Sequence, residues 1–131
     1  MDFSKHTILV VDDNSLYRRF LNALITKTLK AKVAEATNPK EAFAYLENNI
    51  PTLILLDMEM PFMDGFTALK HIRNNPATKD IPVVPCTAIA TTDLIAQLFN
   101  LKISDYIDKK SNANIISQKL IKLLSSLEQN K

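Results

Sequence analysis

The stretch Leu53-Ile54-Leu55-Leu56-Asp57 decides the fold. Its uninterrupted apolar residues are typical of a short strand buried on both faces, as in a parallel sheet that helices cover. Asp57 stops the run, so we expect its carboxylate at the carboxyl end of that strand, which is the edge where open α/β sheets bind ligands. The following segment, 58–65, contains a proline and an Asp-Gly pair and is predicted to be a loop.

Length and composition limit the classes of protein to consider. A chain of 131 residues with 47% hydrophobic residues predicts one domain with a substantial core, and its net charge of +2 is too small to argue for nucleic-acid binding. Cys86 is the single cysteine, which excludes an internal disulfide and favours a reducing cytoplasm. No apolar stretch reaches membrane-spanning length, and the N-terminus lacks the apolar core of a signal peptide. Gly65 is the single glycine, so the chain has no Gly-rich phosphate loop.

Strand-like and helix-like segments alternate along the chain. The strands are expected at 6–11, 32–36, 53–57, 81–87 and 103–107. Pro85 is unusual inside a strand, because it removes a donor from the hydrogen-bond ladder. Each strand is followed by apolar residues at helical spacing, which predicts five βα units, a parallel sheet and helices on both of its faces.

Capping residues indicate where several of these helices begin. The candidates are Asn14 or Ser15 for the first helix, Asn38 with Pro39 behind it for the second, and Thr92 or Asp93 for the fourth. The first helix is expected to run to Leu29, the third to lie between Gly65 and Asn74, and the fifth to start near 111–112.

Polar and charged residues mark the ends of the predicted strands. They are Asp12 and Asp13 after the first strand, Asp57 at the end of the third, Thr87 at the end of the fourth and Lys109 after the fifth. Because the carboxyl ends of parallel strands share one edge, we expect these groups to cluster. Ionised carboxylates repel by roughly 4 kcal/mol per pair at about 4 Å and an effective dielectric near 20, so positive charge is needed among them.

Lys109 supplies one positive charge, and a divalent cation would supply more. An all-oxygen site that retains water suits Mg²⁺, or Mn²⁺, rather than Zn²⁺. Such a metal commonly assists phosphoryl transfer, and an aspartate beside it, here Asp57, is suited to form an acyl phosphate as the nucleophile. Thr87 and Lys109 are candidates to bind the phosphoryl oxygens.

This constellation resembles the receiver domain of bacterial response regulators, the CheY-like family. The residues that carry the resemblance are Asp12-Asp13, Asp57, Thr87-Ala88, Tyr106 and Lys109, together with the phosphoacceptor loop 55–65. The resemblance covers essentially the whole chain. It implies a flavodoxin-like α/β/α sandwich with five parallel strands in the order 2-1-3-4-5. We expect one receiver domain over 1–131, with a core at about 5–127 and frayed ends.

The resemblance also implies a chemistry. Asp57 would accept a phosphoryl group from a phosphohistidine on a sensor kinase or a histidine phosphotransfer protein. Asp12, Asp13 and Asp57 would hold Mg²⁺ together with the backbone carbonyl of Met58. The chain would then be a signalling switch that catalyses only its own phosphorylation and dephosphorylation, not an enzyme acting on other substrates.

A second group of residues is implied to bind the phosphoryl group and to report on it. Lys109 would pair with the phosphoryl oxygens, with Ala88 beside them. Thr87 would swing toward the phosphoryl group while Tyr106 turns inward. These movements would reshape the surface of the fourth helix, fifth strand and fifth helix, where partner proteins dock.

Several positions depart from the family pattern. Lys110 stands where the family has a proline, usually after a cis bond, so we expect either a trans bond with a shifted loop or a retained cis bond costing about 3 kcal/mol. Pro85 is expected to perturb the fourth strand, and the segment 101–106 lacks the Gly-Ala that usually precedes the fifth. Glu59 and Ile89 occupy loop positions that influence the lifetime of the phosphoryl group in this family.

Other reactive residue types have simpler interpretations. His6 and His71 are expected at the surface, unpaired with the acids. Cys86 is expected to be an inert buried residue, and the methionines of the loop 58–63 to serve loop packing.

Three alternatives stay open beside the switch. One is a small phosphatase of the haloacid-dehalogenase type, suggested by the near-miss Asp57-Met58-Glu59. Another is a receiver that signals without phosphorylation, suggested by Lys110. The third is a receiver taken from a larger regulator or hybrid kinase, against which the initial methionine argues. Output is expected through contact with another protein, with no direct binding of nucleic acid or membrane.

Overall fold

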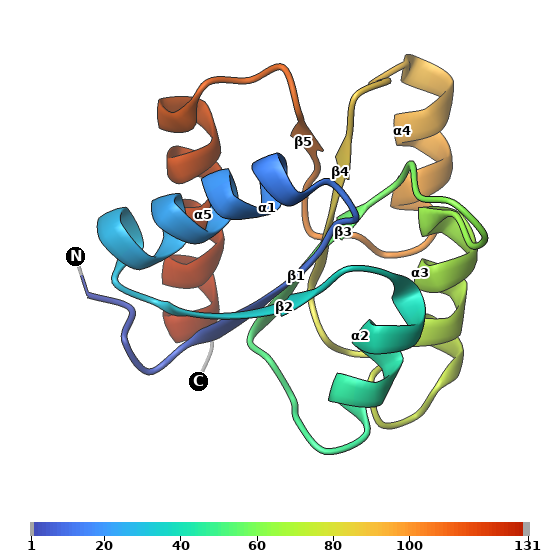
Figure 1. Cartoon of the computed structure of the whole chain (residues 1–131), viewed down its shortest axis with the longest axis horizontal. Helices are drawn as coiled ribbons and strands as arrows, with labels where there is room; N and C mark the ends of the chain where they lie inside the picture. Colours follow the sequence, from blue (N-terminus) through green and yellow to red (C-terminus); the bar gives the residue numbers. More distant parts are fainter. Residues whose placement is uncertain (1, 130–131) are drawn as a thin grey trace.

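The computed structural model describes residues 2–129 and forms a parallel sheet between two layers of helices (Figure 1). The strands are β1 (Thr7–Val11), β2 (Lys32–Ala36), β3 (Leu53–Asp57), β4 (Val83–Thr87) and β5 (Ile107–Asp108). All neighbours pair in parallel, in the order β2-β1-β3-β4-β5. The predicted fold class and strand order are therefore confirmed, and β3 lies in the middle of the sheet.

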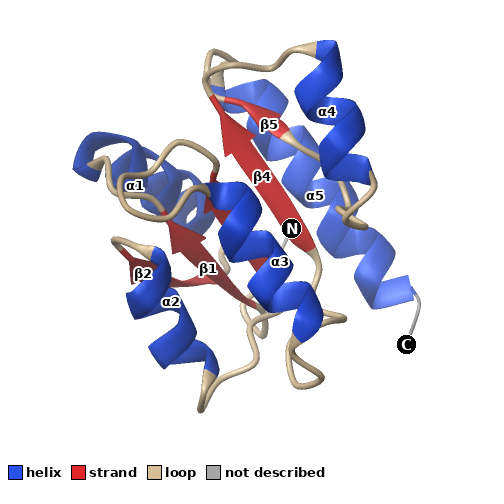
Figure 2. Ribbon diagram, turned by 90° about the vertical axis from the view of Figure 1, so that its right-hand side faces the viewer, coloured by secondary structure: helices blue, strands red, loops and turns tan. Residues whose placement is uncertain are grey.

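The helices divide between the two faces of the sheet (Figures 1 and 2). They are α1 (Ser15–Ala23), which continues as the π-helical segment η1 (Leu24–Leu29), α2 (Pro39–Leu46), α3 (Gly65–Asn74), α4 (Thr92–Phe99) and α5 (Ala113–Gln129). The cluster of buried residues on one face joins the sheet to α1, η1 and α5. The cluster on the other face joins it to α2, α3 and α4.

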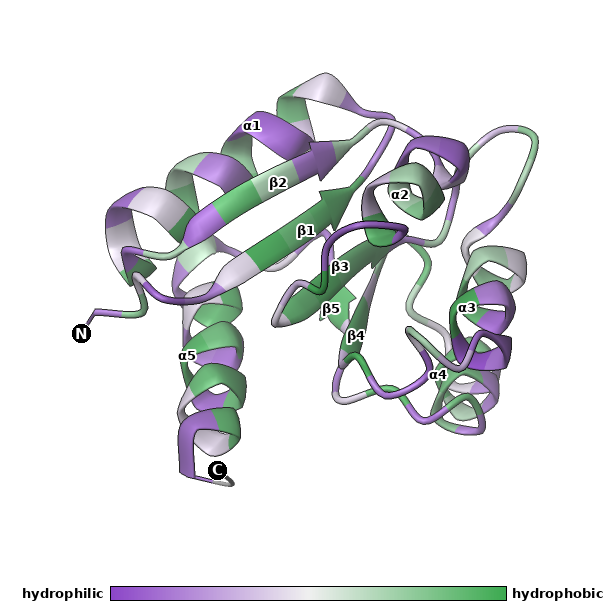
Figure 3. Ribbon diagram, turned by 90° about the horizontal axis from the view of Figure 1, so that it is seen from below, coloured by the Kyte–Doolittle hydropathy of each residue, from purple (hydrophilic) through white to green (hydrophobic). Residues whose placement is uncertain are grey.

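The apolar run of β3 supplies both cores. Leu53 and Leu55 belong to the cluster under α1 and α5, whereas Ile54 and Leu56 belong to the cluster under α2, α3 and α4. All four side chains are at most 1% exposed. Because successive side chains of a strand point to opposite faces, a strand covered on both sides needs apolar residues at every position. Figure 3 shows the resulting apolar colour along β1 and β3.

The helix starts agree with the capping analysis except at α4. The side chains of Asn14 and Asn38 accept hydrogen bonds from backbone N–H groups of α1 and α2. At α4 the cap is Thr91, whose hydroxyl accepts from the N–H of Leu94 at 3.2 Å. The prediction of Thr92 or Asp93 was wrong by one or two residues, because adjacent polar residues can serve equally and sequence alone does not fix the helix register.

The fourth and fifth strands are shorter than predicted. β4 begins at Val83 instead of residue 81, and β5 covers Ile107–Asp108 instead of 103–107. The carbonyls of Val83 and Thr87 accept hydrogen bonds from the N–H groups of Ser104 and Lys109, which lie on the β5 side of β4. Backbone groups of every second residue in a strand point to the same side, so the nitrogen of Pro85 also faces β5. Pro85 has no N–H to donate there, which shortens β5 and leaves the pairing with β3 intact. Figure 2 shows the short β5 beside β4.

The segment before β5 is held by Arg73 instead of a Gly-Ala turn. Its guanidinium donates to the carbonyls of Leu101 and Lys102 in this turn, and to those of Lys79 and Ile81 in the loop between α3 and β4, so it ties the two segments together. Lys102 adopts φ 59°, a left-handed conformation that favours glycine. The expected difference in this turn is confirmed, and the bonds from Arg73 stabilise it.

The ends of the chain are more ordered than predicted within the described range. Phe3 is 4% exposed and belongs to a core cluster, and α5 continues to Gln129. His6 was wrongly expected at the surface: it is buried, and its ring nitrogens lie 3.1 Å from the Thr52 hydroxyl and 3.0 Å from the Glu128 carboxylate. Residues 130 and 131 of the predicted frayed end lie outside the described residues.

Other simple expectations are met. His71 is exposed and Cys86 is a buried free thiol. Met58 and Met60 are buried in the core beneath α3, and Met63 packs against it. No helix within residues 2–129 combines the length and apolarity needed to cross a membrane.

Candidate functional site

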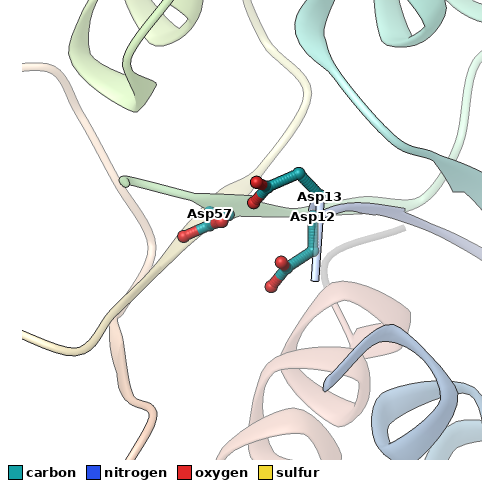
Figure 4. Close-up of side chains that lie close together, drawn as sticks. All are labelled: Asp12, Asp13 and Asp57. Carbon is teal, nitrogen blue, oxygen red and sulfur yellow. The ribbon is translucent and has the colours of Figure 1, made fainter. Parts of the chain in front are cut away.

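Three aspartates meet at the carboxyl edge of the sheet, as the strand ends predicted. Asp12 and Asp13 follow β1, and Asp57 ends the neighbouring β3; Figure 4 shows them side by side. One carboxylate oxygen from each lies within 4.8 Å of the others. Asp12 and Asp57 are each 1% exposed, whereas Asp13 is open to solvent. The cluster therefore consists of two buried acids and a third, Asp13, that is exposed to solvent.

Lys109 reaches both buried acids. Its Nζ lies 2.9 Å from Asp12 Oδ2 and 3.1 Å from Asp57 Oδ1, and 4.7 Å from the centre of the Tyr17 ring. The bond from Lys109 to Lys110 is trans, which decides between the two alternatives left open by the sequence. The Lys109 N–H donates to the Thr87 carbonyl at 2.9 Å. Pairing with β4 thus positions Lys109 without the proline.

The remaining turn after Lys109 is closed by Asp108. The side chain of Asp108 accepts from the Lys110 N–H at 2.9 Å, and its carbonyl accepts from the Ser111 N–H at 2.9 Å. The turn therefore uses the N–H of Lys110, which a proline at this position would lack.

Burial and charge act together on the ionisation of the cluster. Burial raises the pKa of Asp57 to about 7, and the charge of Asp12 acts in the same direction, while the Glu59 N–H and Lys109 oppose it. Burial alone would lower the pKa of Lys109, but its hydrogen bonds and charge interactions with Asp12 and Asp57 raise it. Lys109 therefore stays charged, whereas the site disfavours the charge of Asp57.

The cluster fits a hard divalent cation. The second oxygen of Asp57, Oδ2, is buried and has no hydrogen-bond partner among the described residues. An unpartnered buried carboxylate oxygen beside two further carboxylates is a donor set suited to Mg²⁺ or Mn²⁺. The Met58 carbonyl accepts from the Gly65 N–H at 3.2 Å, and a carbonyl oxygen has a second lone pair for a ligand.

Gly65 fixes the loop that carries these groups. A Cβ at this position would lie 2.6 Å from the Met58 Cα and 2.8 Å from the Asp57 carbonyl oxygen. Both neighbours are backbone atoms of the site, so a side chain at 65 would displace them. The single glycine of the chain therefore stands where the start of α3 passes closest to the acids.

Thr87 and Ala88 lie at the end of β4, where their donors bind Glu59. The Thr87 hydroxyl donates to Glu59 Oε2 at 2.6 Å, and the Ala88 N–H donates to Glu59 Oε1 at 2.9 Å. The Ile89 N–H donates to the Thr87 hydroxyl oxygen at 3.0 Å. The sequence analysis named all four residues but missed the contact of Glu59 with Thr87 and Ala88. Its signal in the sequence is an acid two residues after Asp57, because β3 and β4 are neighbouring strands that end at the same edge.

Tyr106 lies on the rim, half-buried, and packs against the core beneath α2, α3 and α4. Lys119 of α5 was not identified from the sequence: its Nζ lies 4.3 Å from the centre of the Tyr106 ring and donates to the Tyr106 carbonyl at 2.6 Å. The same ammonium lies 3.4 Å from Asp105. Tyr106 thus packs on one side against this core and on the other against Lys119, and it lies just before β5 instead of inside the predicted strand 103–107.

Comparison with known proteins gives one consistent result. The family model for the response regulator receiver domain matches residues 8–121. The chain is 31% identical to the chemotaxis protein CheY of Bacillus subtilis (strain 168), over 92% of this chain and 98% of that protein. It is 42% identical to the response regulator PleD of Caulobacter vibrioides over 63% of this chain, which spans only 18% of PleD.

The fold likeness extends to solved structures. A CheY-like receiver domain protein from Methanospirillum hungatei JF-1 superposes with a TM-score of 0.86, at 22% identity, over 96% of this chain and 98% of that one. A receiver domain from Methanoculleus marisnigri JR1 is 32% identical, with a TM-score of 0.74, over 88% of this chain and 93% of that one.

Proposed function

Because the chain belongs to the response regulator receiver domain family of two-component signalling, we propose that it is switched by transfer of a phosphoryl group to Asp57. The family implies a kinase or a phosphotransfer protein as partner, and the phosphodonor proposed here is the phosphohistidine of either. The observation that carries the proposal is the buried Asp57 carboxylate, whose Oδ2 has no partner among the described residues while Oδ1 is held by Lys109.

The transfer exchanges one bond to phosphorus for another. An Asp57 oxygen attacks the phosphorus, the O–P bond forms, the P–N bond of the phosphohistidine breaks, and the electron pair leaves with the imidazole. Lys109 fixes the attacking carboxylate through Oδ1 and places a positive charge beside the transferred oxygens. Mg²⁺, held by Asp12, Asp13, Asp57 and the Met58 carbonyl, would neutralise the charge of the phosphoryl oxygens.

The output follows from new anion contacts. Thr87 ends β4 and Ala88 follows it, and the hydroxyl and N–H that these residues now donate to Glu59 would bind phosphoryl oxygens instead. We propose that this rearranges the surface of α4, β5 and α5, where Tyr106 lies against Lys119 and where a partner protein binds. Glu59 and Ile89 contact these donors, which supports the proposal that they influence the lifetime of the phosphoryl group.

The alternatives from the sequence are less well supported. The family match favours a signalling switch over a haloacid-dehalogenase-type phosphatase. A receiver independent of phosphorylation was suggested by Lys110, but Lys109 reaches Asp12 and Asp57 without a following proline. A single domain over 1–131 and a cytoplasmic location stay predictions.

The experiment is phosphorylation by a small-molecule donor. Incubation with Mg²⁺ and acetyl phosphate is expected to add one phosphoryl group, measured by intact mass. The adduct should be absent from Asp57→Ala and present in Asp93→Asn, which removes an exposed acid from the first turn of α4. No adduct on the wild type, or an unchanged adduct on Asp57→Ala, would show the proposal to be wrong.

A further inference from the structure

We propose that the Glu59 carboxylate is an internal anion that occupies the Thr87 and Ala88 donors in the resting chain and must be displaced when Asp57 is phosphorylated. This inference rests on the proposed function, since it concerns the same donors. It adds a competitor that belongs to the chain itself.

The contact is a two-point anion site. The two oxygens of Glu59 accept separately, one from the Thr87 hydroxyl at 2.6 Å and one from the Ala88 N–H at 2.9 Å. The Thr87 oxygen in turn accepts from the Ile89 N–H at 3.0 Å, which orients its hydroxyl hydrogen toward Glu59. Hydrogen bonds to a charged acceptor are short and roughly twice as strong as neutral ones. The pair of donors is therefore already occupied by an anion.

The backbone places this anion beside the phosphoacceptor. The Glu59 N–H donates to Asp57 Oδ1 at 3.1 Å, so residue 59 is anchored to the carboxylate that would carry the phosphoryl group. From that anchor its side chain extends to the end of β4. A phosphoryl group offers the same chemistry as this carboxylate, namely oxygens that accept from a hydroxyl and an N–H. Both anions cannot use the same two hydrogens at once.

The Glu59 side chain is free to leave this contact. It is an exposed residue on the loop after β3, so its side chain can turn to solvent without disturbing the core. The Glu59 N–H bond to Asp57 does not involve the side chain and can persist. Displacement therefore costs the two side-chain hydrogen bonds, and the phosphoryl group regains equivalent bonds to the donors. Glu59 therefore weakens phosphoryl binding and holds the Thr87 hydroxyl in the resting chain.

Three substitutions separate occupation from simple charge repulsion. Glu59→Asp keeps the charge but withdraws the carboxylate by about 1.5 Å, the length of one C–C bond, so it cannot span both donors. Glu59→Gln removes the charge and keeps the reach, with one amide oxygen left to accept. Glu59→Ala removes both. Glu47→Gln, which neutralises an exposed acid at the far end of α2, is the control for net charge.

The first measurement is the amide resonance of Ala88 without Mg²⁺ or any phosphoryl analogue. It is expected to move in Glu59→Asp and Glu59→Ala, because both lose the acceptor at 2.9 Å, and to stay in Glu47→Gln. An Ala88 resonance that is the same in wild type, Glu59→Asp and Glu59→Ala overturns the contact, whatever the chain does with phosphate.

The second measurement is the affinity for beryllofluoride at saturating Mg²⁺. Freed donors should make Glu59→Asp and Glu59→Ala bind it about tenfold more tightly than wild type, the effect of one charge-assisted hydrogen bond. If charge repulsion alone operates, Glu59→Gln and Glu59→Ala gain affinity while Glu59→Asp behaves as wild type, and the proposal is wrong. Equal affinities in all proteins also overturn it but leave the proposed function standing. If neither the wild type nor any variant binds beryllofluoride, the proposed function is wrong. The Ala88 resonance alone then tests the contact with Glu59.

Discussion

Replacing Asp57 by Asn is expected to stabilise the metal-free protein at pH 8 by about 1–3 kcal/mol, although it removes the proposed phosphoacceptor. Asp57 is 1% exposed and one of its oxygens has no hydrogen-bond partner among the described residues. A buried charge with an unpartnered oxygen lowers the free energy of unfolding. An Asn side chain has nearly the same shape and keeps an oxygen for the Glu59 N–H and for Lys109.

The magnitude follows from the charges around Asp57. Its carboxylate has an oxygen within 4.8 Å of oxygens of Asp12 and Asp13, and each such pair costs about 3.5 kcal/mol at an effective dielectric near 20. Lys109 at 3.1 Å contributes about 5 kcal/mol of attraction by the same rule. The two repulsions exceed the attraction by about 2 kcal/mol. Solvent around the exposed Asp13 lowers this figure, and the unpartnered oxygen of Asp57 raises it.

The gain is expected to depend on pH. The pKa of Asp57 is raised from 3.8 to about 7 in the folded chain. Between these values the folded chain holds a proton that the unfolded chain has lost, so wild-type stability falls as the pH rises from about 4 to about 7. Asn does not titrate, so the advantage of the variant should be largest at pH 8 and small near pH 4. Excess Mg²⁺ should reduce the advantage at pH 8 by binding the folded wild type.

Urea unfolding followed by far-UV circular dichroism in EDTA measures this effect. With an m-value of about 1–3 kcal/mol/M, the midpoint of Asp57→Asn should rise by roughly 0.5–1 M at pH 8. Asp93→Asn is the control, because Asp93 is an exposed acid in the first turn of α4 and its loss should lower the midpoint slightly. A variant no more stable than wild type at pH 8, or an equal gain at pH 5 and pH 8, would refute the electrostatic reasoning.

Substitutions at three further positions test how the site and the turn before β5 are held. Lys109→Met should lower the free energy of unfolding in urea by about 2–4 kcal/mol at pH 8, and by less at pH 5 where Asp57 takes up a proton; a loss independent of pH would contradict this. Arg73→Ala should lose about 2–3 kcal/mol in thermal unfolding, since its guanidinium bonds the turn before β5 to the loop before β4, and Arg73→Lys should recover less than half of that loss. Lys102→Gly should raise the urea midpoint by the equivalent of about 0.5–1 kcal/mol, because φ 59° strains a lysine and not a glycine; a lower midpoint would show that the lysine side chain stabilises the turn.

The central strand and the acids were predictable because they depend on local patterns. The apolar run before Asp57 requires burial on both faces, and a parallel sheet with helices on both sides is the arrangement that provides it. Once the strands are parallel, topology brings Asp12 and Asp57 to one edge, whatever their distance in the sequence. No side-chain detail is needed for either step.

Features that depend on distant partners were not predictable. His6 is buried because it bonds Glu128, 122 residues later, and no local pattern indicates that pair. β5 is short because Pro85 on the neighbouring strand offers it no N–H, and the turn before it is held by Arg73 from α3. Each of these requires knowing which segments meet before asking what their side chains do.

Lys109 shows how a lost sequence feature can leave a site intact. The missing proline at 110 suggests a displaced lysine if the loop alone positions it. Two other forces act on the residue: its N–H pairs with the Thr87 carbonyl, and its ammonium is drawn between Asp12 and Asp57. Two buried acids without a cation would repel strongly, so the charge requirement fixes the end of the side chain while strand pairing fixes its base. A substitution at 110 therefore changes the turn and spares the contacts of Lys109 with Asp12 and Asp57, whereas a substitution at 109 cannot be compensated by the loop.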